Sequence, residues 1–198
     1  MLCLNHCVVA TYPADTKRKI TFEPWSEWQK KPIPEVLHNE WKAKRAFNKG
    51  MAVILGKIWH RQDKIGYYLI GVDADNRKAI EEICTRNGKT IRLEEFANDT
   101  LVEWHKDNPD KAHVYFYSPR PFAKKSSDVC NDDMQPNIET LSNKIPAFEV
   151  KALGEHGIMF CTPSLHKNGQ PYAESTDNEW NRLGKHIQHS FCCARVIM

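Results

Sequence analysis

Two apolar runs near the middle of the chain constrain its fold most. Residues 51–59 read "MAVILGKIW" and residues 66–74 read "GYYLIGVDA". Short runs that are rich in β-branched and aromatic side chains are typical of strands. The first run is apolar at consecutive positions, so it predicts a strand that is buried on both faces. A chain of 198 residues with 41% hydrophobic residues can provide such a core.

The second run leads into two acidic residues, Asp73 and Asp75, one residue apart. Side chains at positions i and i+2 of a strand share a face, so the two carboxylates should lie side by side. At about 5 Å and an effective dielectric constant of about 20, their repulsion is about 3 kcal/mol. Solvation, protonation of one group or a divalent cation would relieve it, and oxygen ligands suit Mg²⁺ or Mn²⁺. The alternative is a solvated turn, because a chain with 25 acidic residues contains about three such pairs by chance.

The remaining patterns mix strands, hairpins and helices, which favours an α+β fold over a doubly wound parallel sheet. Polar and irregular stretches at residues 16–34 and 121–144 predict loops. The first helix should bury Val36, Leu37 and Trp41. The expected strands are residues 3–12, 51–59, 66–74, 100–105, 112–118, 147–153 and 157–164, and the expected helices are residues 34–47, 77–86 and a segment after Thr176.

We expect a single domain over residues 1–198, with an N-terminal α/β part (1–60), a core (61–175) and a C-terminal helix and tail (176–198). No apolar run approaches the length of a membrane span. The net charge of +3 does not by itself indicate a nucleic-acid partner, although it permits a local basic groove.

Seven cysteines without regular spacing indicate reduced thiols in a cytoplasmic protein. Cys3, His6 and Cys7 form the one dense Cys/His patch. It lacks a second ligand pair, so ordinary buried thiols are the alternative to a zinc site there.

Further polar residues suggest phosphoryl-transfer chemistry. Glu149 stands in an apolar strand-like run, and three carboxylates on adjacent strands can hold two metal ions about 3.5–4 Å apart. His113 and His166 can donate to phosphate oxygens, and Ser164 offers a hydroxyl and a backbone N–H in a turn. Lys167 and Arg120 are further phosphate or template candidates. Each also has a structural alternative, such as a sheet histidine, a salt bridge from Glu149 to Lys151, or plain turn residues.

The order of these motifs resembles a known family. "VDAD", then "KAHVYF", then "FEVKALGEHGIMFCTPSLHKNGQPY" is similar to the archaeo-eukaryotic primase superfamily. More narrowly, it resembles the primase-polymerase (PrimPol) domain of archaeal and mobile-element replication proteins, of the bifunctional DNA primase/polymerase N-terminal type. The resemblance covers roughly residues 20–175. It departs from the family pattern at Glu149, where Asp is more frequent, and at Lys111, where a small residue is usual.

The resemblance implies a fold, a reaction and roles. The fold would be a catalytic sheet of the RNA-recognition-motif (RRM) type with an N-terminal α/β unit packed against it. The reaction would be template-directed nucleotidyl transfer from (d)NTPs on a DNA template, with two Mg²⁺ or Mn²⁺ ions. A replicative helicase or other replication proteins would be further partners. The implied catalytic metal ligands are Asp73, Asp75 and Glu149, and the implied nucleotide-binding residues are His113, Ser164 and His166.

Two alternative functions stay open. Glu149-Val150-Lys151 is an ExK triplet, and with an upstream aspartate it resembles metal-dependent nucleases of the restriction-enzyme type, in which the lysine helps to activate water. Those aspartates usually lie closer in sequence than Asp73 does. The other alternative is a catalytically silent nucleic-acid or nucleotide-binding module, because aromatic and basic neighbours such as Trp59 and Arg61 suit stacking on single strands.

Overall fold

The computed structural model describes about half of the chain, chiefly as two antiparallel sheets stacked between helices. The described residues are 8–10, 24–48, 50–59, 66–86, 88–90, 92, 102–105, 108–122, 125–126, 146–154, 157–165 and 169–170. The elements are β1 (Val8–Ala10), η1 (Ser26–Gln29), α1 (Glu35–Ala43), η2 (Ala46–Asn48), β2 (Met51–Ile54), β3 (Gly56–Lys57), β4 (Tyr68–Ala74), α2 (Arg77–Cys84), β5 (Thr85–Arg86), β6 (Lys89–Thr90), β7 (Val102–His105), β8 (Asn108–Ser118), β9 (Lys125–Ser126), β10 (Phe148–Lys151) and β11 (Ile158–Cys161). This is an α+β fold, as the sequence predicted.

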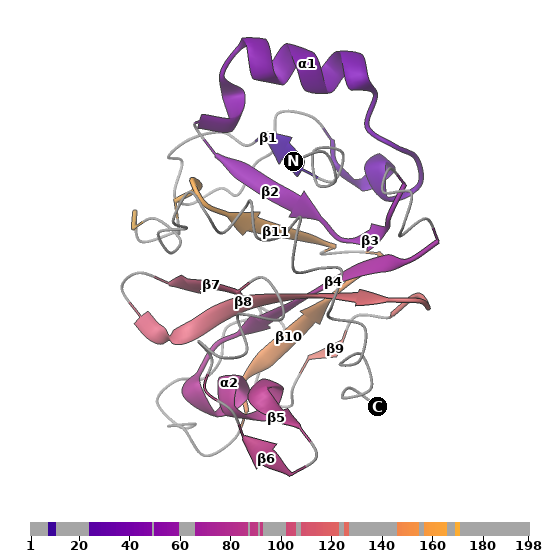
Figure 1. Ribbon diagram of the computed structural model, residues 1–198. Coiled ribbons are helices and arrows are strands. Elements are labelled where there is room, and N and C mark those ends of the chain that lie inside the picture. The colour runs from indigo at the N-terminus through magenta and orange to yellow at the C-terminus, as the bar shows by residue number, and fades with distance from the viewer. Residues whose placement is uncertain are drawn as a thin grey trace.

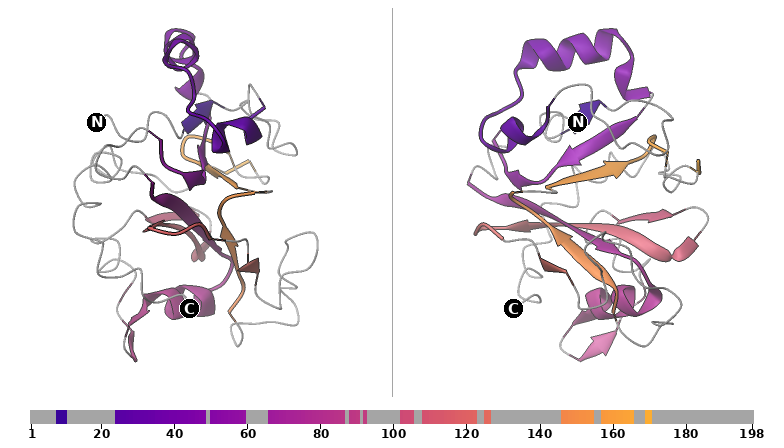
Figure 2. Two further views of the ribbon diagram at one scale, coloured as in Figure 1. Left: turned by 90° about the vertical axis from the view of Figure 1, so that its right-hand side faces the viewer. Right: turned by 180° about the vertical axis from the view of Figure 1, so that it is seen from behind.

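Four layers follow one another through the molecule. Figure 1 shows α1 above the small sheet, then the larger sheet, then α2 at the other end, and both views of Figure 2 keep this order. The small sheet has the strand order β1-β2-β11, and the larger sheet has the order β7-β8-β4-β10-β9 with β3 paired to β4. The described helices include none with both the length and the apolar character that a membrane crossing requires.

The helix α1 covers the outer face of the small sheet. Its buried residues are His38 and Trp41. Trp41 belongs to an apolar cluster that includes Ala52 of β2, and the ring of His38 packs against Trp41. Val36 is 79% exposed, so its predicted burial was wrong. The helix begins after Pro34 and ends earlier than expected, since Arg45 adopts the left-handed conformation (φ 53°) and the chain continues as η2.

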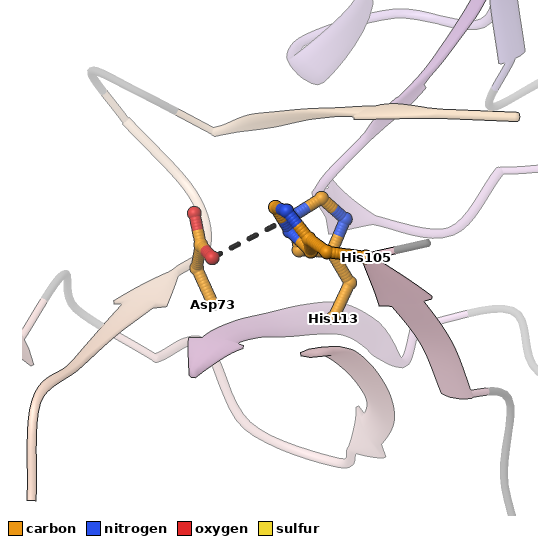
Figure 3. A group of neighbouring side chains, drawn as sticks. All are labelled: Asp73, His105 and His113. Atoms are coloured by element: carbon orange, nitrogen blue, oxygen red, sulfur yellow. Dashed lines mark ion pairs between the residues drawn. The ribbon is translucent and has the colours of Figure 1, made fainter. Parts of the chain in front are cut away.

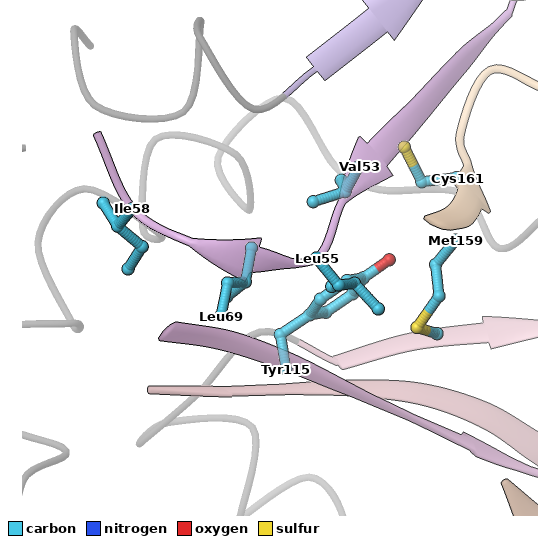
Figure 4. Packing of buried hydrophobic residues seen from close by; sticks show 7 residues of the cluster. All are labelled: Val53, Leu55, Ile58, Leu69, Tyr115, Met159 and Cys161. Atoms are coloured by element: carbon cyan, nitrogen blue, oxygen red, sulfur yellow. The ribbon is translucent and has the colours of Figure 1, made fainter. Parts of the chain in front are cut away.

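The single strand expected at residues 51–59 is divided between the two sheets. Gly56 has φ 115°, a conformation that favours glycine, and the chain bends there. As a result β2 pairs with β1 and β11, whereas β3 pairs with β4 of the larger sheet. Between the sheets, Figure 4 shows Leu55 and Met159 meeting Leu69 and Tyr115 in one apolar cluster.

A buried glutamine joins the two sheets. The Nε2 of Gln29 donates hydrogen bonds to the carbonyl oxygens of Leu55 (2.8 Å), Ala152 (3.3 Å) and Gly157 (3.3 Å), and its Oε1 accepts one from the N–H of Gly154 (3.1 Å). A Cβ at Gly157 would lie 1.8 Å from the same Nε2. The side-chain amide therefore connects the bend after β2 to the connection between β10 and β11.

We expect Gln29→Leu to lower the free energy of unfolding by about 2–4 kcal/mol, because each buried backbone group left without its partner costs about 1–3 kcal/mol. Urea unfolding followed by tryptophan fluorescence measures the change. Lys30→Ala at the exposed neighbouring position is the control, with an expected change within about 0.5 kcal/mol. An unchanged midpoint for Gln29→Leu would contradict this role.

The helix α2 covers the far face of the larger sheet. The side chain of Asn76 caps it by accepting a hydrogen bond from the N–H of Ala79 (2.9 Å), and it also accepts one from the N–H of Ala147 beside β10 (3.1 Å). The helix ends at Cys84, two residues earlier than predicted, because residues 85–86 pair with β6. Gly88 lies in the turn of this hairpin with φ 75°.

Several other predictions are also tested. The strands expected at residues 100–105 and 112–118 are confirmed as β7 and β8, which pair with each other. Those expected at residues 147–153 and 157–164 are confirmed as β10 and β11, which belong to different sheets. The loop predicted at residues 121–144 contains β9, which pairs with β10, and the loop predicted at 16–34 contains η1. Most of the strand expected at 3–12, residues 127–144 of that loop, the C-terminal helix and the Cys3 patch lie outside the described residues.

Candidate functional site

A row of polar residues crosses one face of the larger sheet. Glu103 of β7 pairs with His113 of β8, His113 with Asp73 of β4, and Asp73 with Glu149 of β10. Directly paired residues share a face of the sheet, so all four side chains project to the same side. Glu103, His113 and Glu149 are only 3–4% exposed. The sheet thus brings together three residues predicted for the site, from segments far apart in sequence.

The row lies on the face of β4 that is turned towards the small sheet. On this face Leu69 packs into the apolar cluster between the sheets, and a Cβ at Gly71 would lie 2.0 Å from the Sδ of Met159. Asp73 follows on the same face. Ile70 and Val72 alternate with these residues and pack into a separate apolar cluster. Side chains of β4 therefore alternate between two faces. One face is apolar, and the other changes from apolar at Leu69 to acidic at Asp73.

Two lysines lie beside Asp73, Asp75 and Glu149 and offset part of their negative charge. The Nζ of Lys151 lies 3.1 Å from the Oδ2 of Asp73 and 3.5 Å from the Oε2 of Glu149. The Nζ of Lys111 donates a hydrogen bond to the Oδ1 of Asp75 (2.7 Å). Asp75 directly follows β4, and its N–H donates to the carbonyl of residue 147 beside β10. Asp73 and Glu149 thus share one ammonium group, and Asp75 has another.

Three carboxylates and two ammonium groups leave a surplus of negative charge here. Burial and the neighbouring Asp73 carboxylate raise the pKa of Asp75 above its usual 3.8, although Lys111 and Lys151 act to lower it. Burial alone would lower the pKa of Lys151, but Asp73 and Glu149 outweigh that effect and raise it. An added cation would therefore be stabilised here.

His113 lies between two carboxylates. Its Nε2 is 3.5 Å from the Oδ1 of Asp73, and its Nδ1 is 3.7 Å from the Oε2 of Glu103. Glu103 is held in turn by hydrogen bonds from the Tyr115 hydroxyl (3.0 Å) and the Thr162 N–H (3.1 Å). Glu103 was not among the predicted site residues. It could have been predicted, because it is an acidic residue in the β-prone run at residues 100–105, and pairing of this run with the next strand can place it opposite His113.

Three side chains converge on one point beside this row. One ligand atom each from Asp73, His105 and His113 lie within 4.8 Å of one another, a grouping that can hold a metal ion (Figure 3). The rings of His105 and His113 are perpendicular, with centroids 5.2 Å apart. His105 was also not among the predicted site residues, although the strand expected at residues 100–105 includes it.

Ser164 takes part in the packing of the small sheet. Its hydroxyl donates a hydrogen bond to the carbonyl of Met51 (2.6 Å) and accepts one from the N–H of the same residue (2.8 Å). Its own N–H donates to the carbonyl of Cys161 (2.8 Å). These bonds attach the turn after β11 to the start of β2. A contact between Ser164 and phosphate stays a prediction.

The other predicted phosphate contacts do not join this group in the described part of the chain. Arg120 is exposed and follows Ser118, which pairs with Tyr68 at the opposite end of β4 from Asp73. His166 and Lys167 lie outside the described residues.

The buried thiol and phenol near the row predict loss of stability at alkaline pH. Burial, and next the charge of Glu103, raise the pKa of Tyr115 well above 10.0 and that of Cys161 well above 9.0. The folded protein keeps both groups neutral, whereas the unfolded chain releases their protons at about pH 9–10. Their contribution to stability is therefore complete below about pH 8 and is lost as the pH rises through 9–11.

We expect Tyr115→Phe to reduce this alkaline loss, since only the wild-type chain gains a phenolate on unfolding. Urea midpoints measured between about pH 7 and about pH 11 give the profile of each protein. The difference between the two profiles is the relevant quantity, because other groups titrate equally in both. Parallel profiles would contradict the prediction.

Compared with known proteins, the chain matches no protein-family model, and no curated protein is significantly similar to it. The chemistry of the site must therefore be inferred from its own residues.

Proposed function

We propose that the protein is a nucleotidyl transferase that extends a nucleic-acid strand on a DNA template, using (d)NTPs and two Mg²⁺ or Mn²⁺ ions. The observation that supports this most is the gathering of Asp73, Asp75 and Glu149 at one end of β4 and β10, on or directly beside two paired strands. The α+β architecture, with an N-terminal unit stacked on a larger antiparallel sheet, suits the primase-polymerase fold that the sequence resembles.

The donor set suits hard divalent cations. Asp73, Asp75 and Glu149 offer only carboxylate oxygens, the ligands that Mg²⁺ and Mn²⁺ accept alongside substrate phosphates. The raised pKa of Asp75 reflects burial and negative charge that bound cations would offset. When bound, two ions would activate the attacking hydroxyl and neutralise charge on the leaving pyrophosphate.

The protein's own side chains would position the triphosphate. His113 is fixed between Asp73 and Glu103, so one ring nitrogen is held near the carboxylates that would carry the metal. An imidazole N–H there can donate to a phosphate oxygen. Lys111 and Lys151 are cations at the same place and would contact phosphate once the metal ions take over their carboxylates.

A strand-extension assay tests the proposal. The full chain is incubated with a labelled primer on a DNA template, Mn²⁺ or Mg²⁺, and either dNTPs or NTPs. We expect elongated products whose sequence follows the template, and none when a chelator is present. An unprimed single-stranded template, with each nucleotide type in turn, then shows whether the protein also starts chains. An unchanged primer under all these conditions would refute the proposal.

One observation favours a second candidate, a metal-dependent nuclease. The sequence separation of Asp73 from the Glu149-Val150-Lys151 triplet counted against it, yet cross-strand pairing brings Asp73 opposite Glu149 and places the Lys151 ammonium 3.1 Å from Asp73. In such enzymes the lysine helps to activate water. The same assay separates the two functions, because a nuclease shortens the labelled strand whether or not nucleotides are present.

A further inference from the structure

The cluster of Asp73, His105 and His113 has a different ligand chemistry from the three carboxylates. It combines one carboxylate oxygen with two imidazole nitrogens, all within 4.8 Å of one another. His105 and His113 are 7% and 4% exposed, so the cluster is well shielded from water. Neutral imidazole suits Zn²⁺ and similar transition metals, whereas Mg²⁺ prefers oxygen ligands.

Metal binding requires these ligand atoms to approach one another by at most about 1.5 Å. In a tetrahedral site with metal–ligand bonds of about 2.0–2.1 Å, ligand atoms are about 3.3 Å apart. The Nε2 of His113 and the Oδ1 of Asp73 are already 3.5 Å apart. His105 extends from the end of β7, where the pairing with β8 is irregular, so its ring can approach without disturbing a regular ladder.

The residues behind the cluster resemble the outer shell of a metal site. A histidine that ligates metal through one nitrogen usually directs the other to a carboxylate or a carbonyl. The Nδ1 of His113 faces Glu103 at 3.7 Å, and Tyr115 and Thr162 fix that carboxylate by hydrogen bonds. His113 is thus already oriented with its Nε2 towards Asp73.

We infer that Asp73, His105 and His113 bind one transition-metal ion of the Zn²⁺ type, with a fourth position left for water or another ligand. This site shares Asp73 with the three-carboxylate set and His113 with the predicted triphosphate contacts. Zn²⁺ bound there therefore excludes the arrangement needed for nucleotidyl transfer, so added Zn²⁺ inhibits strand extension. The inhibition depends on the proposed function, whereas the binding of Zn²⁺ does not.

Zinc stoichiometry in the full chain tests the binding directly. Equilibrium dialysis and competition with a chromogenic chelator give the number and affinity of bound Zn²⁺ ions for the wild type, His105→Asn and Glu149→Gln. We expect His105→Asn to lose one ion or to bind it more than about 100-fold more weakly, since even outer-shell changes cost about 10- to 100-fold. Glu149→Gln is the matched control in the same polar row, and it should retain the ion. Because Cys3, His6 and Cys7 offer other ligands, the difference between wild type and variant is the quantity to compare.

His105→Cys provides a second test that does not depend on losing the site. A cysteine at this position remains a zinc ligand, and with Co²⁺ it should add a thiolate-to-cobalt charge-transfer band in the near ultraviolet beyond any that the wild type shows. Equal zinc stoichiometry and affinity in the wild type and His105→Asn, or no additional band in His105→Cys, would overturn the inference.

The inhibition is tested separately in the extension assay. We expect the Zn²⁺ concentration for half-inhibition to be at least about 10-fold higher for His105→Asn than for the wild type. Equal values would overturn the competition between the two sites. If neither protein extends a primer, the proposed function fails, while the stoichiometry and the cobalt spectrum still decide whether Zn²⁺ binds.

Discussion

Asp75→Asn is expected to reduce strand extension by about 1,000-fold or more, equivalent to about 4 kcal/mol of transition-state stabilisation. The amide keeps the shape of the side chain but removes the charge that would hold a divalent ion beside Asp73. The fold should not suffer. Burial and the charge of Asp73 raise the pKa of Asp75, so its ionised form is a cost to the folded state that the amide removes. The melting temperature without divalent ions should therefore be equal to that of the wild type or higher.

Primer extension and thermal unfolding of the same preparations measure both effects. Asp110→Asn is the control, because Asp110 forms its ion pair with Arg77 of α2 (2.7 Å) and its side chain is 36% exposed, against 15% for the side chain of Asp75. That surface pair is worth at most about 1 kcal/mol, and extension should be unaffected. Extension that persists in Asp75→Asn would count against a metal-binding role for this residue.

Lys151→Met is expected to destabilise the protein by about 3–5 kcal/mol in the presence of a chelator. The substitution removes the ammonium that Asp73 and Glu149 share, and it leaves the buried carboxylate of Glu149 and the partly buried one of Asp73 without it. Mn²⁺ should reverse most of this loss, because the ion would occupy the space and supply the charge that the lysine provided. For the same reason Lys151→Met should bind Mn²⁺ more tightly than the wild type.

Urea midpoints measured in chelator and at increasing Mn²⁺ concentrations distinguish the two contributions. Lys89→Met, at an exposed position in β6, serves as the control and should change stability by no more than about 0.5 kcal/mol. A loss of stability that Mn²⁺ does not reverse would mean that Lys151 is only a structural partner. If the wild type shortens DNA and Lys151→Met does not, this result would instead support the nuclease.

Strand periodicity made part of the site predictable. Asp73 and Asp75 are one residue apart after an apolar run, so their common face follows from the alternation of side chains. The hairpin that carries His113 could be recognised from two β-prone runs around a polar turn, and the α+β class followed from the mixture of patterns. These predictions depend on local spacing, which a single segment contains in full.

Other features depended on partners that no local pattern names. The apolar face of α1 was misplaced at Val36 because a helix buries whichever residues its neighbours cover, here His38 and Trp41. The strand at residues 51–59 was predicted whole because nothing in its composition reveals that the two sides of Gly56 pair with different sheets. Glu103 and His105 joined the site through cross-strand register and an irregular pairing.

Local alternation and composition were enough to identify the strands, the acidic pair and the class of fold, because these properties depend on neighbours along the chain. The tertiary structure alone decided which charges face one another. Pairing between β10 and β4 placed Glu149 opposite Asp73 with Lys151 between them, and pairing between β7 and β8 placed Glu103 and His105 beside His113. Electrostatic interactions depend on distance in space, and residues 76 positions apart come within reach only after the sheet has formed.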